Sequence, residues 1–270
     1  MKLSTLSRPN PAWLALRCAL LFTVPPASAR ITKSRSSAST NVPGTVPEGK
    51  LWQPFYSTVI GAGIEYTSNH GITEYGFPLL IEYSFSDRLT LSIEPKYVSI
   101  VSHSPDQESV KGWGDLETTL VWEFLRERRY RPALSLETGV KWPIAEHADL
   151  GEPGFDYTVG LIASKDLVYL DVDLNARYTF SGHSQRQDNV ELSAAMAWHI
   201  TPRIDVIGEV SMTLPTDRRR VAEPASMSTE ALVGLAWQVN KYLKFEQGVI
   251  FKERGEWEAV FAFEWSFGGD

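Results

Sequence analysis

VYLDVDLNARYTF, residues 168–180, alternates apolar and polar side chains without a break. One set of positions holds Val, Leu, Ala, Tyr and Phe, whereas Tyr169 and the Asp, Asn, Arg and Thr residues fill the positions between them. Successive side chains of a β-strand point to opposite faces, so the segment predicts a strand with one apolar and one charged face. A tilted strand of about 9–11 residues crosses a bilayer, and this segment is long enough to do so.

Eleven other segments show the same alternation and are separated by turn residues. They are residues 56–66, 73–85, 89–101, 115–125, 132–144, 155–164, 190–200, 204–214, 229–239, 243–252 and 257–267. Barrels of outer membranes are built from such segments, with apolar side chains outside and polar ones inside. The pattern therefore predicts an all-β fold, a transmembrane antiparallel up-and-down β-barrel of about twelve strands.

The links between these segments differ in length in a regular order. Short turns lie near residues 86, 128, 167, 202 and 241, and longer polar links lie near residues 69, 107, 149, 184 and 221. Bacterial outer-membrane barrels have short periplasmic turns and longer extracellular loops. We therefore expect a strict alternation of short and long links, with both chain termini on the periplasmic side.

A soluble β-sandwich or a lipocalin-like barrel is the alternative fold. Either one would bury the apolar faces of twelve long strands, with many of the nine Trp residues of the chain, in a single interior. The segments from the first strand to the last hold too few residues for an interior of that size. Helical membrane spans are not expected, because the chain has no apolar run of about 18 residues.

The N-terminal segment has the features of a secretory signal. Lys2, Arg8 and Arg17 precede the apolar run 19–24, and Ala27-Ser28-Ala29 matches a signal-peptidase site. We therefore expect three parts in the chain: a signal peptide over 1–29, a disordered periplasmic linker over 30–50 and the barrel over 51–270. The linker is assigned from its Ser, Thr, Pro and Gly content.

The net charge of the chain limits the kinds of partner that it can bind. The net charge is -7 at neutral pH, and removal of the three basic residues of the signal lowers it to about -10. An acidic chain does not fit nucleic acid as a partner. Cys18 is the only cysteine and lies in the predicted signal, so the mature protein is expected to have no thiol.

The charged faces of the predicted strands would line the barrel interior. At inward positions, acidic residues outnumber basic ones about threefold, which favours cations over anions in an aqueous lumen. Charges that pair with one another in a narrow barrel would instead form a plug, and the sequence leaves both interpretations open. An apolar solute fits such a lumen poorly and would use the rim or a lateral exit through the wall. The residues expected to line the pore or plug are Glu94, Lys96, Glu117, Glu137, Lys141, Asp171, Asp173 and Arg177.

Aromatic residues cluster near the predicted strand ends, where they would form two girdles at the membrane interfaces. Those assigned to the girdles are Trp113, Trp142, Tyr178, Trp257, Trp265 and Phe267. The last strand, WEAVFAFEWSF at 257–267, looks like the terminal signal that the barrel-insertion machinery reads. Here the strand is followed by Gly268-Gly269-Asp270, whereas that signal usually ends on an aromatic residue.

Several of these segments resemble an outer-membrane transporter family named for the meta-pathway of phenol degradation. The resemblance covers roughly residues 55–267, and its most specific elements are the strand opening GWGDL at 112–116 and the turn SDRL at 86–89. Other segments that carry it are YSFSDRLTLSIEPKY (83–97), GWGDLETTLVWEF (112–124), PALSLETGVKWPI (132–144), DYTVGLIASKDL (156–167) and FAFEWSF (261–267). The resemblance implies an outer-membrane barrel associated with uptake of apolar or aromatic compounds.

The leading hypothesis is a porin-like channel in the bacterial outer membrane that passes small solutes passively. It needs no enzyme activity, metal or cofactor, and its partners are outer-membrane lipid, lipopolysaccharide, the insertion machinery and a small-molecule solute. A closed structural or surface-adhesion barrel is the alternative. An outer-membrane hydrolase is a third hypothesis, based on histidines in predicted loops, although no G-x-S-x-G motif occurs. These are His70, His103, His147 and His183, with His199 on a strand and facing inward.

Overall fold

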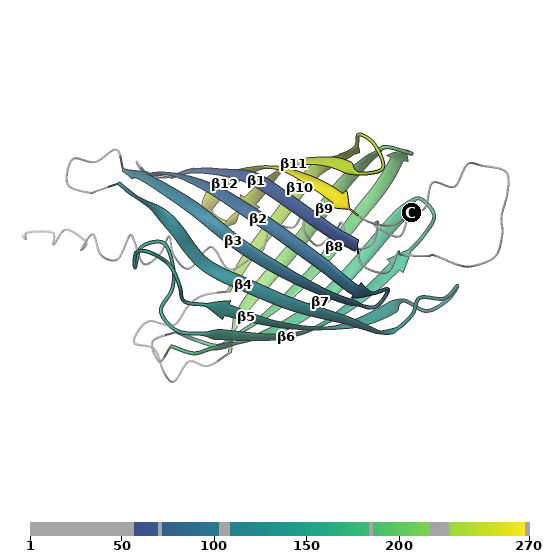
Figure 1. Cartoon of the computed structure of the whole chain (residues 1–270), viewed down its shortest axis with the longest axis horizontal. Coiled ribbons are helices and arrows are strands. Elements are labelled where there is room, and N and C mark those ends of the chain that lie inside the picture. The colour runs from purple at the N-terminus through teal and green to yellow at the C-terminus, as the bar shows by residue number, and fades with distance from the viewer. Residues whose placement is uncertain (1–56, 70–71, 103–108, 184–185, 217–226, 268–270) are drawn as a thin grey trace, which may run out of the picture.

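A computed structural model describes residues 57–69, 72–102, 109–183, 186–216 and 227–267, which form twelve antiparallel strands closed into one barrel (Figure 1). The predicted fold class is confirmed. The strands are β1 (Ser57–Asn69), β2 (Ile72–Ser86), β3 (Leu89–Ser102), β4 (Val110–Leu125), β5 (Ala133–Trp142), β6 (Asp156–Asp166), β7 (Leu170–Ser181), β8 (Asn189–Thr201), β9 (Ile204–Pro215), β10 (Ser228–Gln238), β11 (Leu243–Lys252) and β12 (Trp257–Phe267). A short 3-10 helix, Glu253–Gly255, joins the last two strands.

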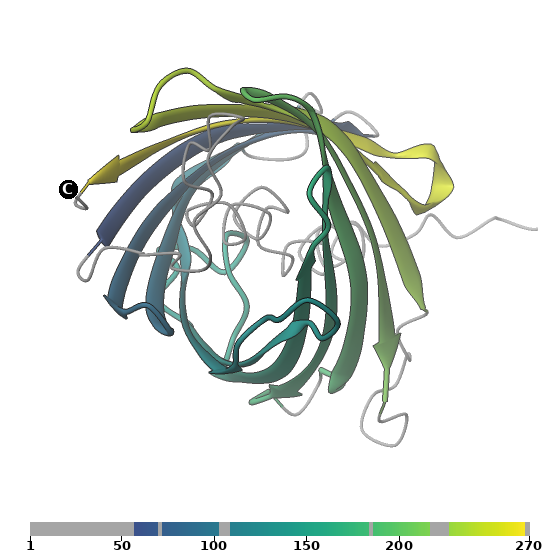
Figure 2. The ribbon, with the colours of Figure 1, turned by 90° about the vertical axis from the view of Figure 1, so that its right-hand side faces the viewer.

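Every strand pairs with its neighbours in sequence, and the first and last strands complete the barrel. β1 and β12 are antiparallel and in register from Thr58↔Phe267 to Thr67↔Glu258. Figure 2 looks along the long axis and shows the strands arranged as a ring. Because the sheet has no free edge, the backbone groups along the strands find partners within the chain.

Apolar side chains cover the outside of the barrel. Large apolar residues are exposed on the outward positions of the strands, among them Trp122 (50%), Leu161 (56%) and Phe261 (54%). Charged residues at the alternate positions are buried, including Glu137, Asp171 and Glu258. This distribution is the reverse of that in a soluble protein and follows from the period of two in every strand.

The predicted strand positions agree with the structure to within a few residues. β4 begins at Val110, five residues before the predicted start, because Val110 and Lys111 pair with Ile100 and Ser99 of β3. β7 begins at Leu170, so the prediction that this strand starts at Val168 is wrong.

The turn before β7 explains why the strand starts late. Asp166 accepts a hydrogen bond from the amide of Val168 (3.0 Å), and Val168 has a φ of 57°. A chain that turns back in this way cannot continue the extended conformation of a strand.

The connections between strands lie at two ends. The links at the end where β1 begins and β12 ends are residues 87–88, 126–132, 167–169, 202–203 and 239–242. The other end carries 70–71, 103–109, 143–155, 182–188, 216–227 and 253–256. The predicted strict alternation of short and long links is wrong at three places, one of which is the short link 253–256. Residues 126–132 form a longer turn closed by an Arg128↔Arg131 bridge, and the long hairpin of β1 and β2 leaves only 70–71 between them.

Within the described residues, none of the helices has the length and apolar character needed to span a membrane. The predicted signal peptide (1–29) and linker (30–50) lie outside the described residues, as do His70 and His103.

The conformation of Val168 predicts that this turn is strained. Val168 is the only non-glycine residue with a positive φ in the described part of the chain, and a β-branched side chain fits that region poorly. We expect Val168→Asn to raise the free energy of unfolding by about 1 kcal/mol, because Asn tolerates the left-handed region. Urea unfolding of the barrel in lipid vesicles, followed by tryptophan fluorescence, measures the change.

Val239→Asn is the matched control, since Val239 lies in another turn at the same end and has no positive φ. An equal or smaller gain for Val168→Asn than for this control would contradict the prediction.

Candidate functional site: the charged interior and the outer mouth

The eight residues predicted to line the pore or plug lie on four strands and point into the barrel. Glu94 and Lys96 lie on β3, Glu117 on β4, Glu137 and Lys141 on β5, and Asp171, Asp173 and Arg177 on β7. Four of them, Glu137, Lys141, Asp171 and Asp173, are buried. Their contacts divide them into separate groups rather than one continuous line.

Glu94, Glu117 and Lys141 form a row across the sheet. The strand register places Glu94 opposite Glu117, Glu117 opposite Lys141, and Lys141 opposite Asp156. The row thus runs over four neighbouring strands and ends beside the loop that follows β5. Lys96, on the next inward position of β3, pairs instead with Glu65 of β1 at 2.5 Å.

Arg177 and Glu137 form an ion pair across an intervening strand. The guanidinium lies 2.9 Å from Glu137 and 3.7 Å from Glu191, and all three side chains are about nine-tenths buried. Gly160 stands between Glu137 and Arg177 in the strand register. The absence of a side chain at Gly160 lets the arginine reach over β6, and Arg177 then bridges two carboxylates on opposite sides.

His199 is held between two carboxylates near the end of the barrel that carries the short turns. Its Nε2 lies 3.3 Å from Asp171 and its Nδ1 lies 3.0 Å from Asp205. The predicted inward position of His199 agrees with these contacts. Asp205 was not among the predicted site residues, because its side chain meets His199 only through the pairing of β8 with β9.

One side of the interior is apolar. Ala195 and Ala197 of β8, Ile207 of β9, and Leu232 and Ala236 of β10 form a buried cluster against which Ile250 of β11 packs. These residues occupy the same face as Asp205 and Glu209, and the sequence analysis did not single them out. The sequence feature that could have predicted this cluster is the presence of apolar residues at inward positions of adjacent strands. The interior therefore has a charged wall over β3 to β7 and a mixed wall over β8 to β11.

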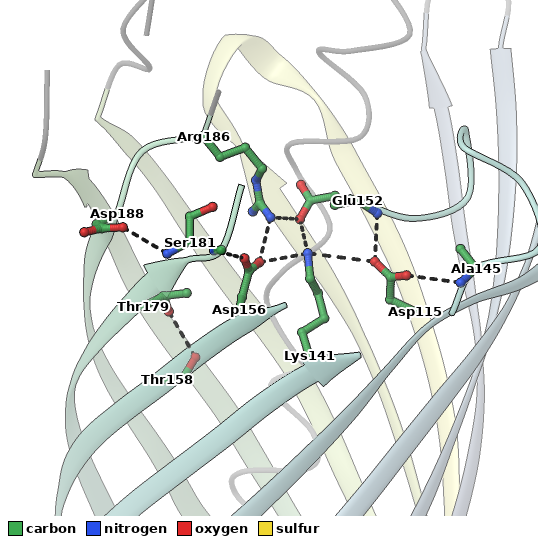
Figure 3. Close-up of polar contacts among 11 residues, drawn as sticks. Asp115, Lys141, Ala145, Glu152, Asp156, Thr158, Thr179, Ser181, Arg186 and Asp188 are labelled. Atoms are coloured by element: carbon green, nitrogen blue, oxygen red, sulfur yellow. Dashed lines mark hydrogen bonds and ion pairs between the residues drawn. The ribbon is translucent and has the colours of Figure 1, made fainter. Parts of the chain in front are cut away.

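A network of five charged residues holds the loop after β5 to the barrel rim (Figure 3). Lys141 lies 2.6 Å from Glu152, 2.8 Å from Asp156 and 3.8 Å from Asp115. Arg186, from the link between β7 and β8, lies 2.7 Å from Glu152 and 2.6 Å from Asp156. Two cations thus join three carboxylates that come from β4, β6 and the loop.

Backbone contacts fix the same loop to the start of β4. Asp115 accepts hydrogen bonds from the amides of Ala145 (3.3 Å) and Glu152 (2.7 Å). The amide of Glu146 donates to the carbonyl of Trp113, and the Glu146 carboxylate accepts from the amide of Trp113. These bonds hold residues 145–152 against β4 at the end of the barrel opposite the start of β1 and the end of β12.

The packing beneath the loop depends on a glycine. Leu150 is buried, and a Cβ at Gly114 would lie only 3.0 Å from the Leu150 carbonyl oxygen. Sequence analysis placed Lys141 in the interior but missed Asp115, Glu152 and Arg186 as its neighbours. Contacts between separate loops leave no periodic signal in a sequence.

The strand ladder is interrupted on the side of the barrel formed by β1, β2 and β3. Between β1 and β2 the paired residues stop at Ala62↔Leu79 and resume at Glu65↔Gly76, and between β2 and β3 they stop at Pro78↔Lys96 and resume at Ile81↔Ile93, with the same register on both sides of each gap. Pro78 lies in this stretch and has no backbone N–H to donate. We call the interrupted part of the wall, residues 61–64 and 77–80, the wall seam.

A small apolar pocket lies in the wall seam, with a volume of about 30 Å³. Leu79 and Phe263 line it from the outer face of the barrel, and Leu80, Val260 and Glu264 line it from the inner face. A volume of this size has room for a few water molecules at most. Side chains from both faces of the wall thus border the pocket, which is too small for an aromatic solute.

Most of the aromatic residues assigned to the girdles are exposed on the outside, namely Trp113, Trp142, Trp257, Trp265 and Phe267. Tyr178 is half-buried, and its hydroxyl donates to Asp188 at 3.1 Å. Ring contacts link neighbouring strands, as between Tyr97 and Trp113 (5.6 Å) and between Tyr66 and Trp257 (6.0 Å). Their role at the membrane interface remains a prediction from this placement.

His, Asp and Glu residues in the described ranges form no group of three or more positioned to hold a metal ion. His147 and His183 lie in links at the end of the barrel opposite the start of β1 and the end of β12.

Comparison with known proteins identifies the family. Residues 54–256 match the family described as "Putative MetA-pathway of phenol degradation", which is more than half of the chain. The chain belongs to this family. The resemblance found from the sequence segments is thereby confirmed. No protein with a curated description matches the chain in sequence.

Solved structures share the fold of this family member. An outer membrane channel from Pseudomonas putida F1 matches with a TM-score of 0.66 at 15% identity, over 83% of this chain and all of that chain. The KdgM porin matches with a TM-score of 0.57 at 15% identity, over 78% and 99%. The NanC porin has a TM-score of 0.59 at 10% identity, over 76% and 98%. At these identities the likeness extends to the fold and not to the solute.

The charged network at the rim predicts that Glu152 holds the loop in place. Glu152→Gln removes the carboxylate shared by Lys141 and Arg186, and breaking a buried ion pair costs about 3–5 kcal/mol. We expect the amides of Glu146 and residue 152 to exchange hydrogen faster, because both donate to β4. Hydrogen–deuterium exchange of the folded barrel measures this.

Asp149→Asn is the control, since Asp149 is exposed in the same loop. Unchanged exchange in Glu152→Gln, or an equal increase in both variants, would show that the network does not hold the loop.

Proposed function

We propose that this protein is a bacterial outer-membrane channel through which small solutes, including apolar or aromatic compounds, pass down their concentration gradient. The observation that carries the proposal is the combination of an apolar outer surface with a polar interior in a closed barrel. Within hydrocarbon, only a closed barrel gives all the backbone N–H and C=O groups of its strands a hydrogen-bond partner. The fold of the porins and of the Pseudomonas channel supports the same location.

The charged interior supports passage of ions along the barrel axis with a preference for cations. Asp171 and Asp173 are buried on β7, and Glu209 and Glu246 are buried on β9 and β11. Carboxylates in a low-dielectric wall lower the local potential and concentrate cations. Lys and Arg residues are fewer at these inward positions, so pairing leaves the acid in excess.

An apolar solute would follow a different route. An apolar solute gains little free energy from contact with the charged wall. The wall seam, by contrast, offers it apolar residues on both the lipid-facing and the interior face. The pocket there is small, so passage requires β1 and β2 to separate locally at the gap in the ladder between Ala62 and Glu65. Fewer ladder bonds must break in this part of the wall than elsewhere.

A closed structural or surface-adhesion barrel is the second candidate. It is favoured by the loop 143–155, which is held over the rim, and by the ion pairs that cross the interior at Arg177. Deletion of an outer loop that abolishes a binding phenotype while solute uptake persists would select it. The hydrolase hypothesis has less support, because His199 lies between two carboxylates rather than beside a serine.

The last strand supports a role for the barrel-insertion machinery as a partner. The side chains of Phe261, Phe263, Trp265 and Phe267 lie exposed on one face of β12, next to the closing contact with β1. A strand that closes the barrel last and presents an aromatic face has the features of the signal that this machinery recognises.

Charge neutralisation tests the axial route. We expect Asp171→Asn with Asp173→Asn to lower the cation-to-anion permeability ratio several-fold, because two buried carboxylates leave the interior. The reversal potential of the purified protein in a planar bilayer under a salt gradient measures the ratio. Asp149→Asn, in an exposed loop position, is the control and should leave it unchanged.

A wild-type barrel that never conducts would favour the closed structural barrel. Conduction with the same selectivity in the double variant would place the ion path away from β7.

A disulfide across the wall seam tests the lateral route. Ala62 and Leu79 are register partners on the outer face, so Ala62→Cys with Leu79→Cys should form a bridge between β1 and β2. We expect uptake of an apolar fluorescent solute into proteoliposomes to fall severalfold on oxidation and to recover on reduction. Ion conductance should stay unchanged, since the bridge lies outside the interior.

Val233→Cys with Val249→Cys is the control, because these residues are register partners on β10 and β11, away from the wall seam. Equal loss in both oxidised pairs would indicate a general effect of cross-linking, and no loss in either would remove the lateral route.

A further inference from the structure

The two ends of the barrel carry opposite charge. The links at the end where β1 begins and β12 ends (87–88, 126–132, 167–169, 202–203 and 239–242) hold seven basic and two acidic residues. The described residues of the links at the other end (109, 143–155, 182–183, 186–188, 216, 227 and 253–256) include two basic and six acidic residues. A chain that is acidic overall therefore has a basic rim at one end, with a net charge of +5.

The basic residues of this end are distributed around the barrel. Arg88 lies between β2 and β3, the group Arg126, Arg128, Arg129 and Arg131 lies between β4 and β5, Arg203 lies between β8 and β9, and Lys241 lies between β10 and β11. All of them except Arg131 are exposed. We call these seven residues the basic rim.

Acidic neighbours neutralise only part of the basic rim. Arg126 pairs with Asp87, and the acid of the longest turn, Glu127, pairs with Lys165 of β6. Glu127 also accepts hydrogen bonds from the amide of Asp166, which joins two neighbouring turns into one unit. The excess of basic charge remains over Arg128 and Arg129, which are exposed at the tip of that turn.

Exposed aromatic residues accompany the basic rim. Tyr130 is 87% exposed, with the Arg129 guanidinium 5.2 Å from its ring centre. Tyr242 is exposed in the turn of Lys241, whose ammonium lies 4.5 Å from the ring. Tyr169 is 71% exposed in the turn before β7. Tyrosine beside arginine or lysine is the composition of protein segments at the headgroup level of a membrane.

We propose that the basic rim binds the phosphate groups of anionic phospholipids in the inner leaflet of the outer membrane. The short turns lie on the periplasmic side of such barrels, so the basic rim lies at that leaflet. Arginine forms paired hydrogen bonds with phosphate oxygens, and tyrosine inserts at the same depth. These contacts fix the depth of the barrel in the membrane and keep anionic lipids around it. This inference rests on the membrane location of the barrel and not on its conduction.

The arrangement favours lipid over an acidic protein partner. Four of the five links at this end carry basic residues and are distributed around a closed barrel, and lipid headgroups surround a barrel on all sides. A single protein partner would contact one side of the barrel, and the basic residues that bind it would be expected to lie on that side. The opposite sign at the outer end also argues against a general surplus of positive charge.

A lipid-selection experiment tests the proposal. The purified full chain is equilibrated with mixed phosphatidylglycerol and phosphatidylcholine, and the lipids that remain bound are counted by native mass spectrometry. Near an anionic surface, each Lys or Arg changes binding by about fivefold. We expect wild type to prefer phosphatidylglycerol, and Arg128→Gln, Arg129→Gln and Arg203→Gln together to lower the preference by about fivefold or more. High salt should lower it as well.

The matched control removes the same charge from a link that is not part of the basic rim. Arg218→Gln, Arg219→Gln and Arg220→Gln together lie in the link between β9 and β10 and should leave the preference unchanged. Heat-modifiable mobility in gels shows that each variant is folded. Planar-bilayer conductance of the same variants separates this proposal from the channel function, since conductance should persist when lipid preference is lost.

Three results would overturn the proposal. One is a wild-type barrel with no preference for phosphatidylglycerol. Another is an equal loss in both triple variants, which would show a bulk charge effect. The third is binding of soluble polyglutamate through Arg128, Arg129 and Arg203 without lipid preference, which would assign the basic rim to an acidic periplasmic protein.

Discussion

The closing contact between β1 and β12 is the interaction on which the rest of the structure depends. Hydrocarbon offers no hydrogen-bond partners, so every backbone amide and carbonyl in the wall must find one within the chain. The register from Thr58↔Phe267 to Thr67↔Glu258 removes both sheet edges at once. Closure also separates two environments, which allows one set of alternate side chains to face lipid while the other faces a polar interior.

Burial of so many charged groups in the interior requires that they find counter-charges. Arg177 reaches Glu137 over Gly160, His199 lies between Asp171 and Asp205, and Lys141 joins the carboxylates at the outer rim. These pairs stiffen the wall over β4 to β8. The opposite side differs, because the ladder has a gap at Pro78 and an apolar cluster lies beside the buried Asp205 and Glu209 near β9 and β10. A barrel with one stiff and one weaker side has a physical basis for separate ion and apolar-solute routes.

The strand pattern predicted the faces of nearly every residue of the interior, because a period of two is local. Parity alone predicts that Glu137, Asp173 and Arg177 point inward and that aromatic residues such as Trp257 and Trp265 point outward. Turn conformation was less predictable. Val168 reads as the first residue of a strand, yet the Asp166 side chain turns the chain at that point. The predicted alternation of short and long links was wrong because the length of a link depends on how far its two strands stay paired, which the strand pattern does not show.

The sequence by itself determined the number of strands, their order and the sign of charge on each face, because these follow from alternation and from links between neighbours. Only the tertiary structure decided which charges meet. Glu152 and Arg186 come from different links, and their contact with Lys141 depends on loops folding onto the rim. The gap in the ladder at Pro78 and the gathering of the basic rim at one end also depend on register and closure. Contacts between distant segments are set by three-dimensional packing, which no local period encodes.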